Sequence, residues 1–255
     1  MPTFKSFNQN SNNEPHQEVV FEKTGPNFLT KVFGTLFISL LATAIISGGL
    51  SAIFASLITG MSEQELFNFA NILNIATSIS ALGLIIMSFA VPIVFAKGKH
   101  KVLPSFVLYV LFMGVLLSSL VLVIPWNVLF EAVGVSCLVF GILTIVGMSS
   151  KGRIPGLSTL IFGLLIGIFF LSLIDIILML TGSNENILVE WVIECLFLAF
   201  IMFVTIMDIR RINTISSMGM ENSDNVVIYS AFIIYTDFIG IFIRIVSFLI
   251  RSNRK

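Results

Sequence analysis

Charged residues are scarce in this sequence. Only 11% of its 255 residues are Asp, Glu, Lys or Arg, whereas a typical soluble domain contains about 25%. Fourteen basic residues balance fourteen acidic ones, which gives no indication of a nucleic-acid partner. Histidine occurs only at His16 and His100, outside the long apolar segments, so the sequence has no HExxH zinc motif and no serine–histidine pair inside them. A glycine-rich phosphate loop is also absent, and we expect neither an enzyme nor a bound cofactor.

Apolar residues, by contrast, are abundant. Hydrophobic side chains make up 56% of the chain, and its mean hydropathy is +1.03. The two cysteines, Cys137 and Cys195, lie inside apolar segments without CxxC spacing. A disulfide or a metal pair is therefore not favoured, and we predict that both cysteines pack as small hydrophobic side chains.

Seven apolar segments have the length of about 20 residues that a helix needs to cross ~30 Å of hydrocarbon. They cover residues 32–58, 69–95, 105–124, 128–149, 157–180, 187–207 and 225–250. We therefore predict an all-α polytopic membrane protein whose seven transmembrane helices, joined by short connections, occupy residues 32–250. Residues 1–31 are rich in Asn, Gln, Glu and Lys and are predicted to form a disordered tail. Residues 251–255 form a short basic tail.

The distribution of Lys and Arg predicts the orientation. The N-terminal tail and the second, fourth and sixth connections hold ten basic residues, whereas the first, third and fifth connections hold none. By the positive-inside rule, the N-terminus and the even connections are cytoplasmic. A seventh crossing then places the basic C-terminal residues outside, so the last segment either crosses against the rule or re-enters and returns. We favour a crossing because about 26 residues are enough to span the bilayer.

The last segment carries an aspartate deep in the predicted membrane. Asp237 lies about twelve residues, or roughly 18 Å of helix, from the start of the segment. A charged side chain at that depth costs roughly 3 kcal/mol, so it is a candidate for function. Ser230, Gly240 and Arg244 fall on the same side of the helix, and this polar stripe should face protein or water. One alternative is an Asp237–Arg244 ion pair that serves packing alone, although two helical turns separate the two residues.

The sixth segment has one acidic face. With 100° of rotation about the helix axis per residue, four of its polar side chains point within about 60° of one another, namely those of Glu190, Glu194, Thr205 and Asp208. Such a face should look toward protein or water rather than lipid. Glu190 is close enough to the interface to reach water, whereas Glu194 lies further in. Asp208 with Asp237 superficially resembles the residue pair of an aspartyl intramembrane protease, but the glycine-flanked aspartate of those enzymes is absent.

Two stretches near the C-terminus combine an aspartate with long apolar runs. They are "FLAFIMFVTIMDIRRI" (residues 197–212) and "YSAFIIYTDFIGIFIRIV" (residues 229–246). Together they resemble the paired C-terminal signatures of the transmembrane Bax inhibitor motif family, in its bacterial type. "VLFEAVGVSCLVFGILTIVG" (residues 128–147) resembles the fourth helix of that family. The sequence departs from the family at Thr236 and Gly240, where leucine and asparagine are usual.

This resemblance implies a bundle with the last helix at its centre and six helices around it. It also implies a calcium-permeable leak governed by an aspartate pair, with Asp208 and Asp237 at the two positions and able to bind calcium transiently. Lys97 stands approximately where bacterial members have an arginine that latches onto the sixth-helix aspartate, and Lys99 is the alternative. Lysine lacks the bidentate grip of arginine, so we expect a weaker latch.

Electrostatics agrees with this function. Two carboxylates a few ångströms apart in a low-dielectric site cannot both be charged cheaply, so they share a proton near neutral pH. The shared proton closes the gap between them, whereas its loss makes them repel each other and attract a hard cation such as calcium. We therefore predict a monomeric, pH-sensitive calcium leak channel in the lipid bilayer. A bacterial cell membrane is favoured because the sequence has no endoplasmic-reticulum retention signal.

Two other functions stay open at this point. One is a non-conducting interaction protein, whose polar stripe holds the bundle together while its loops or tail bind a membrane protease or a cell-death regulator. The other is a proton-coupled cation exchanger. Calcium flux through the purified protein distinguishes the channel from the interaction protein, and stoichiometric proton counter-flow identifies the exchanger.

Overall fold

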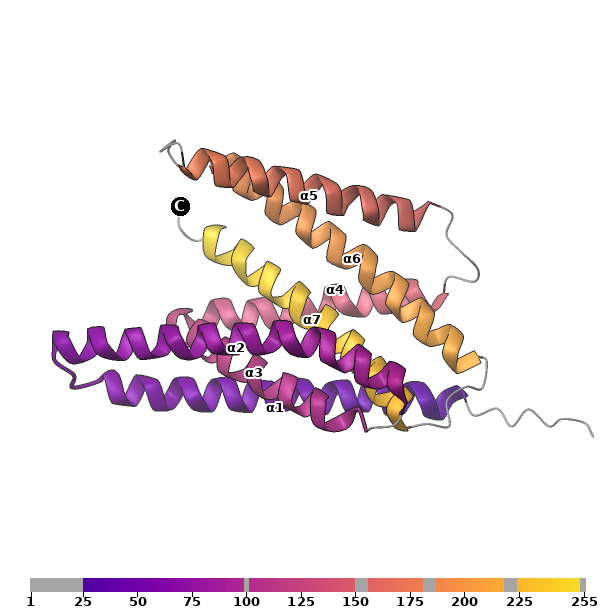
Figure 1. Cartoon of the computed structure of the whole chain (residues 1–255), viewed down its shortest axis with the longest axis horizontal. Helices are drawn as coiled ribbons and strands as arrows, with labels where there is room; N and C mark the ends of the chain where they lie inside the picture. Colours follow the sequence, from indigo (N-terminus) through magenta and orange to yellow (C-terminus); the bar gives the residue numbers. More distant parts are fainter. Residues whose placement is uncertain (1–24, 99–100, 150–155, 181–186, 218–223, 253–255) are drawn as a thin grey trace, which may run out of the picture.

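The computed structural model describes residues 25–98, 101–149, 156–180, 187–217 and 224–252, which form seven α-helices (Figure 1). The helices are α1 (Gly25–Ile58), α2 (Glu63–Lys97), α3 (Leu103–Val123), α4 (Trp126–Ser149), α5 (Leu157–Leu180), α6 (Ile187–Ser217) and α7 (Asp224–Ser252). Each is long and apolar enough to cross a membrane, and these residues form no strand. The predicted all-α, seven-helix membrane fold is confirmed.

Several helices extend beyond the predicted apolar segments. α1 begins at Gly25, so residues 25–31, which we predicted as part of the tail, are helical. α2 begins early because the backbone N–H of Ser62 donates a hydrogen bond of 2.8 Å to the Glu65 carboxylate, a capping-box contact. α6 continues through its polar end to Ser217. The rest of the predicted N-terminal tail lies outside the described residues.

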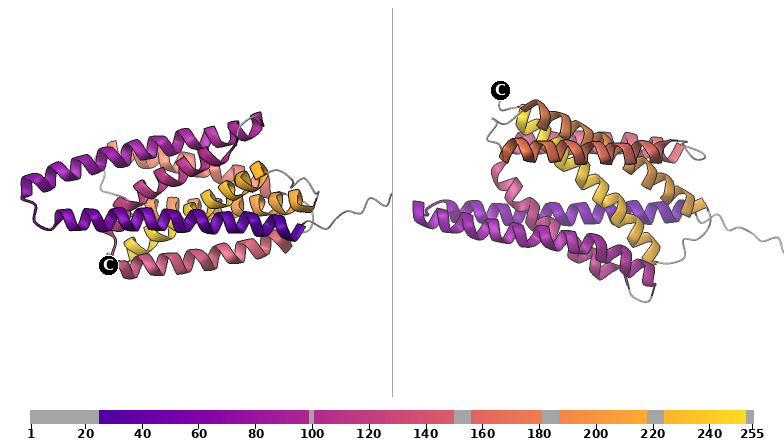
Figure 2. Two further views of the ribbon diagram at one scale, coloured as in Figure 1. Left: turned by 90° about the horizontal axis from the view of Figure 1, so that it is seen from below. Right: turned by 45° about the horizontal axis from the view of Figure 1, so that its top comes forward.

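α7 lies between two groups of helices. In one group α1 and α2 both pack against α3, and in the other α4 and α5 both pack against α6. α7 contacts α1 on one side and α4 and α6 on the other, and Figure 2 shows it running through the bundle. Of an 18-residue apolar stretch of α7, 56% is buried, compared with 39% or less for the corresponding stretches of the other helices. The central position of α7 is confirmed, although α5 packs on the outer side of α6 rather than around α7.

α7 is one continuous helix of 29 residues. At 1.5 Å per residue it is about 43 Å long, which exceeds the thickness of a bilayer's hydrocarbon core. The last segment therefore does not turn back on itself, and the re-entrant alternative is not adopted.

Aromatic side chains join α7 to α3 and α1. Tyr109 of α3 packs edge-to-face on Phe232 of α7, with ring centroids 5.1 Å apart. The fully buried Tyr235 lies on the same flank, where its hydroxyl is 2.6 Å from the hydroxyl of Thr43 on α1. These contacts hold one flank of α7 in place.

Both cysteines lie on the surface of the bundle. Cys137 on α4 and Cys195 on α6 are free and exposed, so the prediction that they are packed as small hydrophobic side chains was wrong. The physical reason is that lipid tails are as apolar as the bundle interior, so an apolar segment does not reveal which of its residues face other helices.

Candidate functional site

The polar faces of α6 and α7 meet along one interface, here called the α6–α7 seam. Its members are Glu190, Glu194, Thr205 and Asp208 of α6 and Asp237, Gly240, Arg244 and Arg251 of α7. The two helices run antiparallel, so the last part of α6 lies beside the first half of α7 (Figure 1). The acidic face and the polar stripe identified in the sequence therefore face each other.

Asp237 is buried in the seam, with only 8% of its surface exposed. The hydroxyl of Thr205 lies beside its carboxyl group and donates a hydrogen bond of 2.8 Å to the backbone carbonyl of Ile201. The Oδ2 atom of Asp237 is buried without a hydrogen-bond partner. A buried carboxylate oxygen without a partner is costly, so this atom is a natural position for a proton, a water molecule or a cation.

Asp208 lies one helical turn beyond Thr205 and is half-buried. It is close enough to Asp237 for the two carboxyl groups to interact electrostatically, although they are far apart in the sequence. Arg211, one turn further along α6, also acts on Asp208. The neighbouring Arg210 has a buried Nε atom without a hydrogen-bond partner. One cation that acts on Asp208 thus comes from α6 itself.

Lys97, the predicted latch, lies at the exposed C-terminal end of α2. Within the described part of the chain it forms no ion pair with Asp208. Two residues earlier, the ring of Phe95 stacks on Tyr229 with centroids 4.1 Å apart, and this contact fixes the end of α2 against the start of α7. The predicted latch is therefore not formed in this structure, and the alternative Lys99 lies outside the described residues.

Two arginines of α7 pair with the two glutamates near the start of α6. Nη1 of Arg244 is 3.0 Å from Oε2 of Glu194, and Nη1 of Arg251 is 2.6 Å from Oε2 of Glu190. The Asp237–Arg244 pair, considered above as an alternative, is therefore wrong, because Arg244 reaches across the seam. Glu190 pairs with an arginine and does not simply reach water. Its negative charge also lowers the cost of a basic residue at the end of α7.

These cross-helix pairs were not predicted, although the sequence contains a signal for them. Along α6 the order is Glu190 then Glu194, and along α7 it is Arg244 then Arg251. In an antiparallel helix pair the first acid meets the last base, which is the observed arrangement.

Between its two polar ends, the seam is closed by apolar packing. A Cβ atom on Gly240 would lie 3.3 Å from Cδ1 of Ile201, so the absence of a side chain lets α6 and α7 approach closely. Ser230, two turns before Asp237, is also buried. The carboxyl pair and the ion pairs therefore lie on opposite sides of a tight helix contact.

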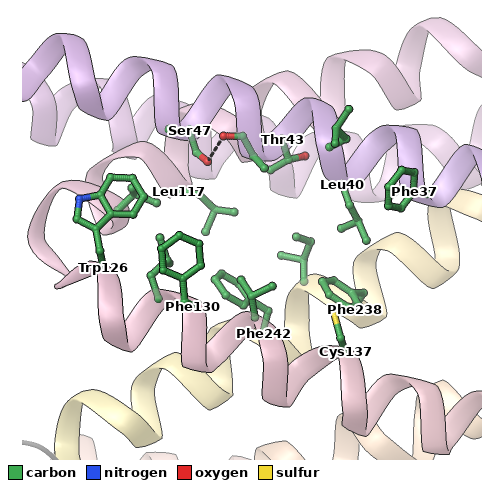
Figure 3. A pocket seen from close by; sticks show the side chains of 17 residues that line it. Phe37, Leu40, Thr43, Ser47, Leu117, Trp126, Phe130, Cys137, Phe238 and Phe242 are labelled. Carbon is green, nitrogen blue, oxygen red and sulfur yellow. Dashed lines mark hydrogen bonds between the residues drawn. The ribbon is translucent and has the colours of Figure 1, made fainter.

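A pocket of about 460 Å³ lies away from the seam, among α1, α3, α4 and α7 (Figure 3). Aromatic side chains form much of its wall, including those of Trp126, Phe130 and Phe242. Thr43 also lines it, but the hydroxyl of this residue is bonded to that of Tyr235. Since none of the described residues that line the pocket is charged, they offer nothing to stabilise an ion, and the polar seam is the better candidate for an ion path.

The described residues contain no group of three or more His, Cys, Asp or Glu side chains placed to hold a metal ion. Asp208 and Asp237 together supply two carboxylate groups, whereas calcium usually takes about six to eight oxygen ligands. A calcium ion at this pair would retain several water molecules. Such a site suits a passing ion better than a resident one.

Comparison with known proteins gives a family match over most of the chain. The family described as "Inhibitor of apoptosis-promoting Bax1" matches residues 25–254. An uncharacterized membrane protein of Streptococcus pyogenes serotype M3 is 27% identical over 157 residues, which are 62% of this chain and 66% of the relative. Uncharacterized membrane proteins of serotypes M6 and M1 match with the same identity and coverage. The chain thus spans just under two thirds of the length of these curated relatives.

Proposed function

Because the chain belongs to the family described as "Inhibitor of apoptosis-promoting Bax1", we propose that this membrane protein is a pH-sensitive calcium leak channel gated by Asp208 and Asp237. The proposal includes no enzymatic activity and no cofactor. A bacterial cell membrane is the proposed compartment, in keeping with the streptococcal membrane proteins to which the chain is similar.

One observation carries this proposal. Asp237 is buried on the central helix, has an oxygen without a hydrogen-bond partner, and lies within electrostatic range of Asp208. A carboxylate used only for packing would be expected to have its lone pairs satisfied. An acid that takes up and releases a proton or a cation instead needs a carboxylate oxygen without a hydrogen-bond partner. It also needs a site of low dielectric constant, where electrostatic interactions are strong.

The closed seam suggests how such a gate works. With one proton shared by Asp208 and Asp237, the two carboxyl groups attract each other and α6 stays against α7. When the proton is lost, two like charges within electrostatic range of each other in a partly desolvated site repel. This repulsion acts next to the tight contact of Ile201 with Gly240 and favours its opening. Arg211 is placed to stabilise the ionised Asp208.

The proposal is tested by calcium flux into liposomes that contain the purified protein and a calcium-sensitive dye. We expect influx above that of protein-free liposomes, with a rate that changes with pH between about 6 and 8. Glu131→Gln is the matched control, because this acid is exposed on α4 and does not belong to the seam. It should retain the pH profile, which Asp237→Asn should abolish.

Each negative outcome identifies a rival. Absence of calcium flux at every pH, from protein that is folded and inserted, would contradict the channel and favour a non-conducting interaction protein. Calcium flux accompanied by a fixed number of protons moving in the opposite direction would instead favour an exchanger. Measuring both ions in the same liposomes therefore separates the three functions.

A further inference from the structure

A second set of charges joins α6 to α7 at the end of the seam away from the aspartates. This distal cluster consists of Glu190, Glu194, Arg244 and Arg251. Its contacts are the two close ion pairs described above and a longer one of 3.9 Å between Arg251 and Glu194. Every contact crosses from one helix to the other, so none survives if the ends of α6 and α7 separate.

The inner pair of the cluster is the better shielded. The Glu194 side chain is 13% exposed and that of Arg244 is 27% exposed. The guanidinium of Arg244 also lies over the ring of Phe197, 4.3 Å from its centroid, which adds a cation–π contact on the same helix as Glu194. The Nη1 atom of Arg244 donates a hydrogen bond of 3.0 Å to Oε2 of Glu194, so this pair links the two helices directly.

The distal cluster and the aspartate pair are separate. Arg244 lies seven residues after Asp237, which is roughly 10 Å along the helix axis. The contact of Ile201 with Gly240 lies between them. Separating α6 from α7 along the whole seam therefore requires two independent events, namely repulsion at the aspartates and rupture of the distal ion pairs.

We propose that the distal cluster is a second gate, in series with the aspartate pair, and that Glu194 and Arg244 are its principal residues. This inference rests on the proposed ion path along the seam. With the ion pairs formed, the guanidinium groups occupy the acidic face of α6 and keep the ends of the helices together. With the pairs broken, Glu190 and Glu194 are left free on the path of an entering cation.

The test uses a cysteine at Ile201, between the two gates, in protein whose exposed Cys137 and Cys195 are replaced by alanine. The rate at which a water-soluble thiol reagent modifies this cysteine is measured in nanodiscs. Glu194→Arg and Arg244→Glu should each increase that rate roughly fivefold or more, the change that loss of one ion pair produces in a two-state equilibrium. The double variant, in which the two charges are exchanged, should return the rate to near that of the parent protein.

A matched control is Glu63→Arg, which reverses an exposed acid at the start of α2 and should leave the rate unchanged. If a single reversal prevents folding, the neutral variants Glu194→Gln and Arg244→Gln replace it, with the same expected direction. Unchanged modification rates in folded single variants would overturn the proposal. Failure of the charge exchange to restore the parent rate, with both single rates increased, would also overturn it.

Calcium flux in the same variants separates this inference from the proposed function. If the protein is a leak channel, each single variant should leak faster and the exchanged variant should return to the parent rate. If modification of the cysteine responds as expected but no variant passes calcium, the distal cluster still holds the seam shut and the channel proposal fails. If calcium passes at a rate that the distal variants leave unchanged, the second gate is contradicted and the aspartate gate is retained.

Discussion

Replacing Gly147 by alanine should destabilise the protein by pushing α4 away from α6. A Cβ atom at this position would lie 2.8 Å from Cγ2 and 2.9 Å from Cβ of Ile209, and 3.3 Å from the backbone oxygen of Ile206. The Cβ atom of Ile209 is fixed to the backbone, so a rotamer change cannot relieve the clash and the helices must shift. Overpacking of this kind typically costs about 1–3 kcal/mol. Ile209 directly follows Asp208, so the shift also reaches the aspartate pair.

Gly141 on the same helix provides the control. A Cβ atom there would meet no heavy atom within 4 Å, so Gly141→Ala should be neutral, or stabilising by up to about 1 kcal/mol through its higher helix propensity. The assay is reversible unfolding of both variants in the same detergent or nanodisc, followed by circular dichroism. Equal stability of the two variants would refute the close α4–α6 contact at Gly147.

Two further predictions concern packing and orientation. Tyr235→Phe removes the hydrogen bond to Thr43 and should lower the free energy of unfolding by about 1 kcal/mol. The control, Tyr229→Phe, retains its ring stacking on Phe95 and should have less effect. An equal loss of stability in both variants would argue against the buried hydrogen bond. The charge distribution predicts that a cysteine at the exposed Ser62 reacts with a membrane-impermeant thiol reagent added outside intact cells, whereas a cysteine at the exposed Lys101 does not. The reverse labelling pattern would overturn the predicted orientation.

Sequence reasoning located the membrane helices well, because crossing a bilayer requires about 20 apolar residues whatever their neighbours. It placed their ends less well. Residues such as those from Arg210 to Ser217 are polar enough to leave the membrane, yet they continue α6, since helix formation depends on local hydrogen bonding rather than on hydropathy. The start of α1 was missed for the same reason.

The candidate site was only partly predictable. The two polar faces followed from helical periodicity, so Asp208, Asp237 and Glu194 were found. Which side chains meet across the seam depends on the position of the two helices relative to each other along their axes. The periodicity of one helix gives no information about that position. Arg244 was therefore compared with Asp237 on its own helix, although its partner is Glu194. Periodicity likewise does not place Lys97 relative to Asp208, because the two residues lie on different helices, and the role of Lys97 stays a prediction.

The most direct test of the aspartate gate is the pH dependence of calcium flux in Asp208→Asn, Asp237→Asn and the double variant. Asparagine keeps the shape and the hydrogen-bonding capacity of aspartate but does not titrate. If the two carboxyl groups act as one unit, each single variant should lose the pH dependence between about 6 and 8, and the double variant should show no larger change than either single one. Full pH dependence retained in folded Asp237→Asn, or additive effects of the two substitutions, would contradict the gate.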